Sequence, residues 1–199
     1  MGKITFSFDD NNSTNELAAW TLNQAGATGI FLLNDSPTLE QDVKMLQGYN
    51  QIVGNHTKQH LLMTNMSEEE FQTEVVDFQK KLEGIAGKVE YFVYPHNAMP
   101  VNQNIQNEII KMFHYRLRGV LEDIKTYDNK TNEILRLRLP EVSIAWLEDY
   151  LEDNDAIVEI HGIMGEKPWD IDLNYFDKLI KLWEKYQSLS LSGESIKSI

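Results

Sequence analysis

The sequence predicts an α/β fold with a parallel sheet, on the basis of three observations. Short apolar segments of strand character alternate along the chain with longer amphipathic segments of helical character. No internal repeat, low-complexity tract or linker interrupts this alternation. The composition, 42% hydrophobic and 25% charged over 199 residues, is typical of a globular protein with a sizeable core. We therefore expect one domain over residues 1–199, with helices packed against parallel strands.

The first third of the chain predicts three strands and two helices. Alternating apolar and hydroxyl side chains mark the first strand, and apolar runs mark the other two. Gly26 closes the first helix, and Ser36-Pro37 begins the second. The expected order is strand 4–8, helix 14–24, strand 29–33, a helix from residue 36, and strand 51–54.

The remaining chain continues the alternation. Ser67 and Glu70 form a capping box that begins a helix ending at Gly84. Pro95 ends the strand that follows this helix. The further expected elements are strand 91–94, helix 105–113, a pair of strands around Asp128-Asn129-Lys130, strand 156–161, helix 174–186, and a last strand in the tail from residue 188.

Charge and composition exclude several classes of function. A formal charge of −13 repels nucleic acid and anionic lipid, so no nucleic-acid partner is expected. The absence of cysteine excludes disulfides and thiolate metal sites, so any metal must be held by His, Asp or Glu. No stretch is apolar enough to span a membrane.

The N-terminus shows no secretory signal. We therefore expect a cytoplasmic protein, although a chain whose leader had been removed would look the same and be extracytoplasmic. Nothing in the sequence indicates an oligomeric state or a partner protein.

Four predicted strands end in residues that carry chemistry. Ligands bind at the carboxyl ends of parallel strands, where the loops converge. Each feature alone has a commoner structural explanation, such as a capping aspartate, surface histidines or a core histidine. Their coincidence on one rim favours a shared site. The four features are Asp9-Asp10, His56 with His60, Pro95-His96, and His161.

His56 and His60 have a spacing that lets both imidazoles reach one metal ion, with a carboxylate as third ligand. The zincin motif has its general base beside the first histidine, but that position is Thr57 here. The base must therefore come from elsewhere, and Asp9-Asp10 offers one carboxylate for the metal and one for proton transfer. Two histidines and a carboxylate also form the triad of non-haem iron oxygenases, although a separate base and acid fit hydrolysis better.

These motifs resemble those of the polysaccharide deacetylases, carbohydrate esterases that share the NodB homology domain. Residues 5–11 are similar to the family's T-F-D-D-G motif, and residues 56–60 to its H-[ST]-x-x-H motif. Residues 91–97, YFVYPHN, resemble its F-A-Y-P-Y-G motif, and residues 157–163, IVEIHGI, resemble the closing strand with its histidine. The resemblance covers nearly the whole chain and implies a distorted, seven-stranded (β/α) barrel with outer helices.

The resemblance also implies a metal-dependent hydrolase that removes acetyl groups from N-acetylated or O-acetylated oligosaccharides or polysaccharides. Asp9 would be the general base, the backbone N–H of His96 would help to hold the oxyanion, and His161 would be the general acid. The divalent ion, zinc with Co²⁺ or Ni²⁺ as alternatives, would be bound by Asp10, His56 and His60.

Two of the family's motifs differ here. The arginine that orients the catalytic aspartate in many members is replaced by Val93, and the tyrosine and glycine near it by His96 and Asn97. Another place for an arginine, after Leu-Pro, is Glu141. Either Arg136 or Arg138 substitutes, or the basic partner is missing; the second case would make the protein a catalytically impaired metal- and sugar-binding relative.

Other positions have weaker assignments. Asn11 replaces a glycine and tolerates a left-handed backbone better than most residues. No residue clearly matches the aspartate and tryptophan that tune the acid histidine. Trp146, Asp149 and Asp155 are candidates, and Trp169 and Tyr175 are either a sugar-stacking platform or ordinary core.

Overall fold

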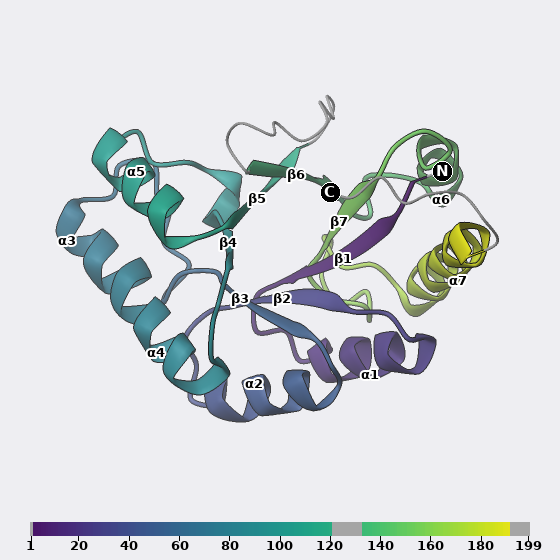
Figure 1. Ribbon diagram of the computed structural model, residues 1–199, viewed down its shortest axis with the longest axis horizontal. Helices are drawn as coiled ribbons and strands as arrows, with labels where there is room; N and C mark the ends of the chain where they lie inside the picture. Colours follow the sequence, from purple (N-terminus) through teal and green to yellow (C-terminus); the bar gives the residue numbers. More distant parts are fainter. Residues whose placement is uncertain (1, 121–132, 192–199) are drawn as a thin grey trace.

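The computed structural model describes residues 2–120 and 133–191 and shows a closed barrel of parallel strands (Figure 1). Each strand pairs with the next along the chain, and the seventh returns to pair with the first. This confirms the distorted seven-stranded (β/α) barrel. The strands are β1 Ile4–Asp9, β2 Gly29–Leu33, β3 Ile52–Asn55, β4 Tyr91–Val93, β5 Tyr115–Val120, β6 Glu133–Arg138 and β7 Ala156–Ile160.

Helices lie around the outside of the barrel (Figure 1). Gly26, with a φ of 76°, ends the first helix in the left-handed conformation that glycine adopts without strain. The longer helices are α1 Asn15–Ala25, α2 Leu39–Gly48, α4 Phe78–Ala86, α5 Gln103–Met112, α6 Ile144–Tyr150 and α7 Leu173–Leu191. Short segments complete them: α3 Glu68–Phe71, the π-helical η1 Gln72–Asp77 and the 3₁₀ turn η2 Pro95–Asn97.

The main core lies between the strands and the outer helices. Phe8 of β1 stacks on Phe31 of β2 with ring centroids 4.5 Å apart, and both Phe6 and Phe8 meet the edge of Phe176 from α7. Because successive side chains of a strand point to opposite faces, Ser7 and Asp9 of β1 then face the barrel interior. The alternation of β1 therefore directs polar groups into the barrel at the end where the strand stops.

Most predicted elements are confirmed, and the structure differs from the prediction at three further points. The capping box at Ser67 and Glu70 is present, but its helix continues through η1 and α4 to Ala86. Gly84 lies within α4, and Gly87, with a φ of 82°, ends the helix instead. Helix α6 was not predicted, because its seven residues are too few for a clear periodicity. The segment from residue 188 continues α7 as far as Leu191 and is not a strand there.

The predicted strand pair flanks residues 121–132 as β5 and β6, which run parallel. The turn Asp128-Asn129-Lys130 itself lies outside the described residues. Among the helices of the described ranges, none has the length and apolar character needed to cross a bilayer.

Candidate active site

Asp9 and Asp10 stand where β1 ends, and both turn toward the barrel mouth. Asp9 is the last residue of the strand and is buried, with an exposed fraction of 3%. Asp10 has a φ of 71°, a left-handed conformation that only Asn, Asp and Gly adopt readily. This turn lets two consecutive carboxylates reach one site, as the sequence analysis required. The left-handed residue is thus Asp10 and not Asn11, whose amide instead exchanges two hydrogen bonds with the backbone of Asn34.

Asp10, His56 and His60 form a compact set of donors for a metal ion. Nε2 of His56 lies 3.5 Å from Oδ1 of Asp10, and Nε2 of His60 lies 3.7 Å from the same oxygen. Ligands about 2.0–2.1 Å from a tetrahedral zinc ion are separated by roughly this distance. Nδ1 of His56 lies 3.2 Å from the carbonyl oxygen of Val93. Since a carbonyl only accepts, Nδ1 carries the hydrogen and Nε2 keeps its lone pair, so the set fits a divalent ion.

The segment that carries the two histidines is a loop and not a helix. Thr57 and His60 both have left-handed φ angles, of 65° and 57°. The Thr57 hydroxyl accepts a hydrogen bond of 3.1 Å from the backbone N–H of His60, and the Thr57 N–H donates to Asn55. The buried threonine therefore holds the turn that brings the second imidazole back to the first.

Burial keeps the two imidazoles neutral. Loss of solvation lowers the pKa of His56 to about 4, against the opposing attraction of Asp9 and Asp10. Partial burial likewise lowers the pKa of His60, against the attraction of Asp10. Neutral imidazole is the form that binds a metal, so little proton competition is expected at neutral pH.

Arg136 is the basic partner of Asp9. It is fully buried on β6 and donates Nη1 to Oδ1 at 2.6 Å and Nη2 to Oδ2 at 2.8 Å. Burial alone would raise the pKa of Asp9, but the charge and hydrogen bonds of Arg136 lower it to about 2. Of the alternatives left open by Val93 and Glu141, the structure selects Arg136. Glu141 is half exposed and lies 3.8 Å from Arg138.

His161 follows β7 and lies beside Asp9 and Glu159. Ring nitrogens and carboxylate oxygens of the three side chains lie within 4.8 Å of one another. Nδ1 of His161 is buried and has no hydrogen-bond partner among the described residues. Glu159 is not among the residues predicted from the sequence, although one signal was available: it is the only charged residue in the apolar strand AIVEI.

His96 and Asn97 form a tight turn at the mouth, with φ angles of 55° and 56°. The exposed His96 ring lies edge-on to His60, with centroids 4.5 Å apart. The Asn97 carbonyl Oδ1 accepts a 2.5 Å hydrogen bond from the N–H of Gly119 on β5. A third imidazole thus stands next to the metal-ligand set in place of the family's tyrosine.

A cavity of about 250 Å³ joins these groups. A second hollow of about 210 Å³ shares Arg138 and His161 with it and extends to Pro168 and Trp169, whose side chain is 47% exposed. The first cavity is lined by Asp9, His56, His60, Tyr94, His96, Asn97, Arg138, Glu159 and His161.

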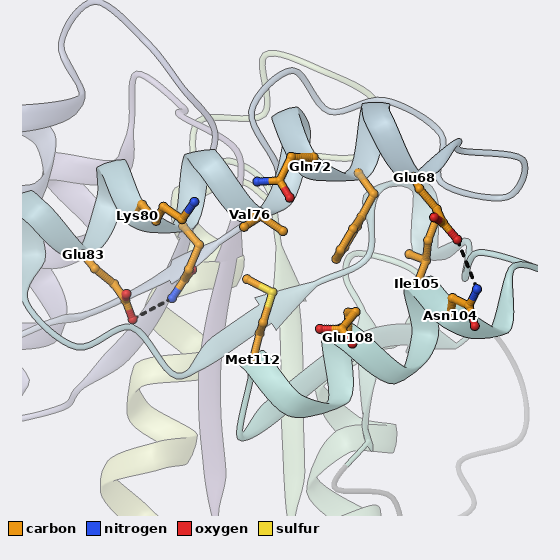
Figure 2. Close-up of a pocket in the computed structure, with 11 residues that line it drawn as sticks. Glu68, Gln72, Val76, Lys80, Glu83, Asn104, Ile105, Glu108 and Met112 are labelled. Carbon is orange, nitrogen blue, oxygen red and sulfur yellow. Dashed lines mark hydrogen bonds between the residues drawn. The ribbon is translucent and has the colours of Figure 1, made fainter.

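A larger hollow of about 670 Å³ lies on the outer surface between η1, α4 and α5 (Figure 2). Apolar side chains, among them Val76 and Met112, lie inside it, and Glu68 and Glu83 stand toward its two ends. Its lining includes no histidine and none of the rim residues, so we assign the chemistry to the smaller cavity at the barrel mouth.

The weaker candidates from the sequence lie elsewhere or act structurally. Trp146 is on the outer helix α6, stacked on Tyr150, and Asp155 binds the N–H of Lys3 at the opposite end of the barrel. The Tyr175 hydroxyl donates to the carbonyl of Val142, so Tyr175 is a packing residue. Asp149 is also on α6, and only Trp169 borders the site.

Comparison with known proteins identifies the family. A model of the family described as polysaccharide deacetylase matches residues 2–115, more than half of the chain. The chain belongs to the polysaccharide deacetylase family. The matched part of this polysaccharide deacetylase homologue includes Asp9, Asp10 and the two histidines, whereas Arg136 and His161 lie beyond it. No curated protein sequence matches the chain.

Solved structures of esterases and deacetylases share the fold of this family member. A chitin deacetylase from the fungal pathogen Colletotrichum lindemuthianum is 16% identical, with a TM-score of 0.64 over 92% of this chain and 82% of that chain. A family 4 acetyl xylan esterase from Clostridium thermocellum, in complex with a cobalt ion, is 14% identical, with a TM-score of 0.60 over 96% and 85%. A CE4 family pseudoenzyme from Bacillus anthracis is 13% identical, with a TM-score of 0.61 over 94% and 61%.

Proposed function

We propose that this protein is a metal-dependent hydrolase that removes acetyl groups from acetylated sugars. The observation that supports this best is the bidentate pair of Arg136 and Asp9 beside the three donors Asp10, His56 and His60. A buried, oriented carboxylate next to a metal-ligand set is the arrangement that general-base hydrolysis requires. Family membership supports deacetylation of carbohydrates as the reaction class.

Asp10, His56 and His60 would hold the ion, zinc or alternatively Co²⁺ or Ni²⁺. The acetyl xylan esterase of the same fold binds cobalt, which supports a divalent ion. When bound, the ion would supply Lewis acidity, making a water more acidic and an acetyl carbonyl more electrophilic.

The protein's own groups then divide the proton transfers. Asp9 is ionised at neutral pH because Arg136 holds its carboxylate, so it is available to accept a proton from the attacking water. The backbone N–H of His96, in its left-handed turn, would donate to the acetyl oxygen as negative charge develops. His161, beside Asp9, would donate a proton to the leaving nitrogen or oxygen.

The substrate that we propose is an acetylated oligosaccharide or polysaccharide. The catalytic cavity suits one acetylated sugar, and the adjoining hollow offers the face of Trp169 to a neighbouring unit. Trp169→Ala is expected to lower kcat/KM on oligosaccharides by about ten-fold while leaving a single acetylated sugar unaffected, since one lost stacking contact costs roughly 1–1.5 kcal/mol. Equal losses on both substrates, measured as acetate release, would rule out this platform.

A specific observation favours a second candidate function, a relative that binds metal and sugar without turnover. His96 and Asn97 replace the usual residues of the oxyanion turn, and a pseudoenzyme shares the fold. This candidate predicts bound metal and no acetate release.

The deciding experiment loads the protein with zinc, cobalt or nickel and measures acetate release. The substrates are N-acetylglucosamine oligomers, chitin fragments, peptidoglycan fragments and acetylated xylan, which separate N- from O-deacetylation. Asp9→Asn is the matched variant: it is expected to keep the metal and lose activity. Metal-loaded protein that releases no acetate from any substrate would establish the second candidate instead.

A further inference from the structure

Glu159 is a buried carboxylate at the barrel mouth that the proposed chemistry does not use. It lies on β7, with an exposed fraction of 1%. Oε2 is 3.2 Å from Nη2 of Arg136, and Oε1 is 3.5 Å from Nε of Arg138. Burial raises the pKa of Glu159, against the attraction of Arg136. A carboxylate in such a place is stable only while cationic groups stay next to it, so it also fixes where those groups stand.

The contacts of Glu159 connect two parts of the site. Nη2 of Arg136 donates to Oδ2 of Asp9 at 2.8 Å and also lies 3.2 Å from Oε2 of Glu159, so one guanidinium nitrogen contacts both carboxylates. Nδ2 of Asn97 approaches Oε1 of Glu159 at 3.5 Å, while Oδ1 of Asn97 is bound by Gly119. One side chain thus contacts both the partner of the base and the turn that begins at His96.

Gly119 on β5 provides an independent observation. A Cβ added to Gly119 would lie 2.0 Å from Oε2 of Glu159 and 2.7 Å from Nδ2 of Asn97. Gly119 has no left-handed φ, so glycine is needed at this position for lack of room for a side chain and not for its backbone conformation. The barrel therefore leaves room on one strand for the carboxylate of another.

We infer that Glu159 is a positioning residue for the reaction: it holds Arg136 against Asp9 and ties down the turn His96–Asn97. In this chain Val93 brings no arginine to β4, so the proposed base depends on an arginine from β6, and Glu159 contacts that same arginine. The inference rests on the proposed function, because it assigns Asp9 and His96 their roles there.

The test compares Glu159→Ala and Glu159→Gln with the wild-type protein loaded with zinc. The alanine variant is expected to lose about 10–100-fold in kcat, the usual effect of removing an outer-shell partner, with KM and zinc content unchanged. The glutamine variant keeps the shape and one acceptor, so it should recover part of that loss. Glu40→Gln, an exposed glutamate on α2 paired with Lys44, controls for the change in net charge.

Gly119→Ala tests the same contact from the opposite strand. Alone, its methyl group should displace Glu159 and lower kcat in the same direction. Combined with Glu159→Ala, it should add little, because residues that act through one contact are not additive. Additive losses would show that the two residues act separately and would overturn the inference.

Crystal structures of the variants distinguish this inference from the proposed function. In Glu159→Gln, and in Glu159→Ala if it folds, we expect Arg136 to leave its bidentate contact with Asp9 or the turn at residues 96–97 to shift. If the wild-type protein releases no acetate, the proposed function fails, and an unmoved Arg136 and turn would still overturn the positioning role. Wild-type kcat in the glutamine and alanine variants, or a change in KM alone, would overturn it as well.

Discussion

At the scale of single residues, the site contains an ion pair between Arg136 and Asp9 that no single sequence motif predicts. Arg136 and Asp9 are 127 positions apart, and both are buried. A buried ion pair is stable only with good geometry, and removing one partner leaves an uncompensated charge. We therefore expect the bidentate geometry of arginine to be needed to hold Asp9 in one orientation.

Arg136→Lys keeps the positive charge and loses the bidentate contact of the guanidinium with Asp9. We expect the free energy of unfolding to fall, by less than the roughly 3–5 kcal/mol expected for Arg136→Met, which leaves Asp9 without a cation. Acetate release should fall in both variants, because the base is no longer held in one orientation. Urea unfolding and kcat measurements check this, and an Arg136→Lys protein with wild-type activity would contradict it.

The metal-free protein should be less stable in acid, because His56 binds a proton more readily in the unfolded chain than in the folded protein. The pKa of His56 is about 4 in the folded state, below its ordinary value of 6.5, so the unfolded chain binds the proton first as the pH falls. The free energy of unfolding should therefore decrease between about pH 6.5 and 4, by at most about 3 kcal/mol from this group. The lowered pKa of Asp9, about 2 against 3.8, extends the decrease to lower pH. In His56→Gln, urea unfolding at several pH values should show a smaller decrease in the free energy of unfolding per pH unit. An unchanged pH dependence would contradict the lowered pKa of His56.

At the scale of elements, a loop after β3 carries the histidine pair. Residues four apart also lie on one face of a helix, so the spacing of His56 and His60 alone does not indicate a loop. Thr57 and His60 have left-handed φ angles, so the chain turns there and does not form a helix. The hydrogen bond from the His60 N–H to the Thr57 hydroxyl stabilises this turn.

Thr57→Val removes this hydroxyl and keeps the branched shape. We expect zinc affinity to fall by about ten-fold, because supporting hydrogen bonds orient metal ligands. Thr57→Ser is the matched control and should retain most of the affinity. Isothermal titration with zinc measures both, and a loss in Thr57→Ser without a loss in Thr57→Val would instead indicate packing of the methyl group as the cause.

Sequence and structure agree on most elements and on the residues at the strand ends. They agree because strand patterns, capping signals and the motifs of β1 and β3 are local in the chain. The choice between Arg136 and Arg138 was not local. The two residues face the same side of β6 and differ only in depth, 0% against 33% side-chain exposure, which is set by the register of β6 on its neighbours. The position of Glu159 in an apolar strand was a local signal, but its partners come from other strands, so the sequence did not indicate what it contacts.

At the scale of the whole molecule, binding of a metal should stabilise the folded barrel. A ligand at 100 times its Kd adds about 2.7 kcal/mol when it binds only the folded state. We expect the thermal midpoint to rise on adding zinc, and the rise to be largely lost in Asp10→Ala. Differential scanning fluorimetry with and without a chelator measures the shift. An equal rise in the variant would place the metal elsewhere.

The pairing of β1 with β7 joins the first and the last strand of the barrel, so the two parts of the site are synthesised at different times. Asp9, Asp10 and both histidines come from the first three strands, whereas Arg136, Glu159 and His161 come from the last two. Contacts between such distant segments form late, because a long loop must close first. As the chain leaves the ribosome, the groups that would bind the ion are made well before the residues proposed to orient the base and supply the acid. We therefore expect the proposed site to be complete only after β7, the last strand of the barrel to be synthesised, has formed.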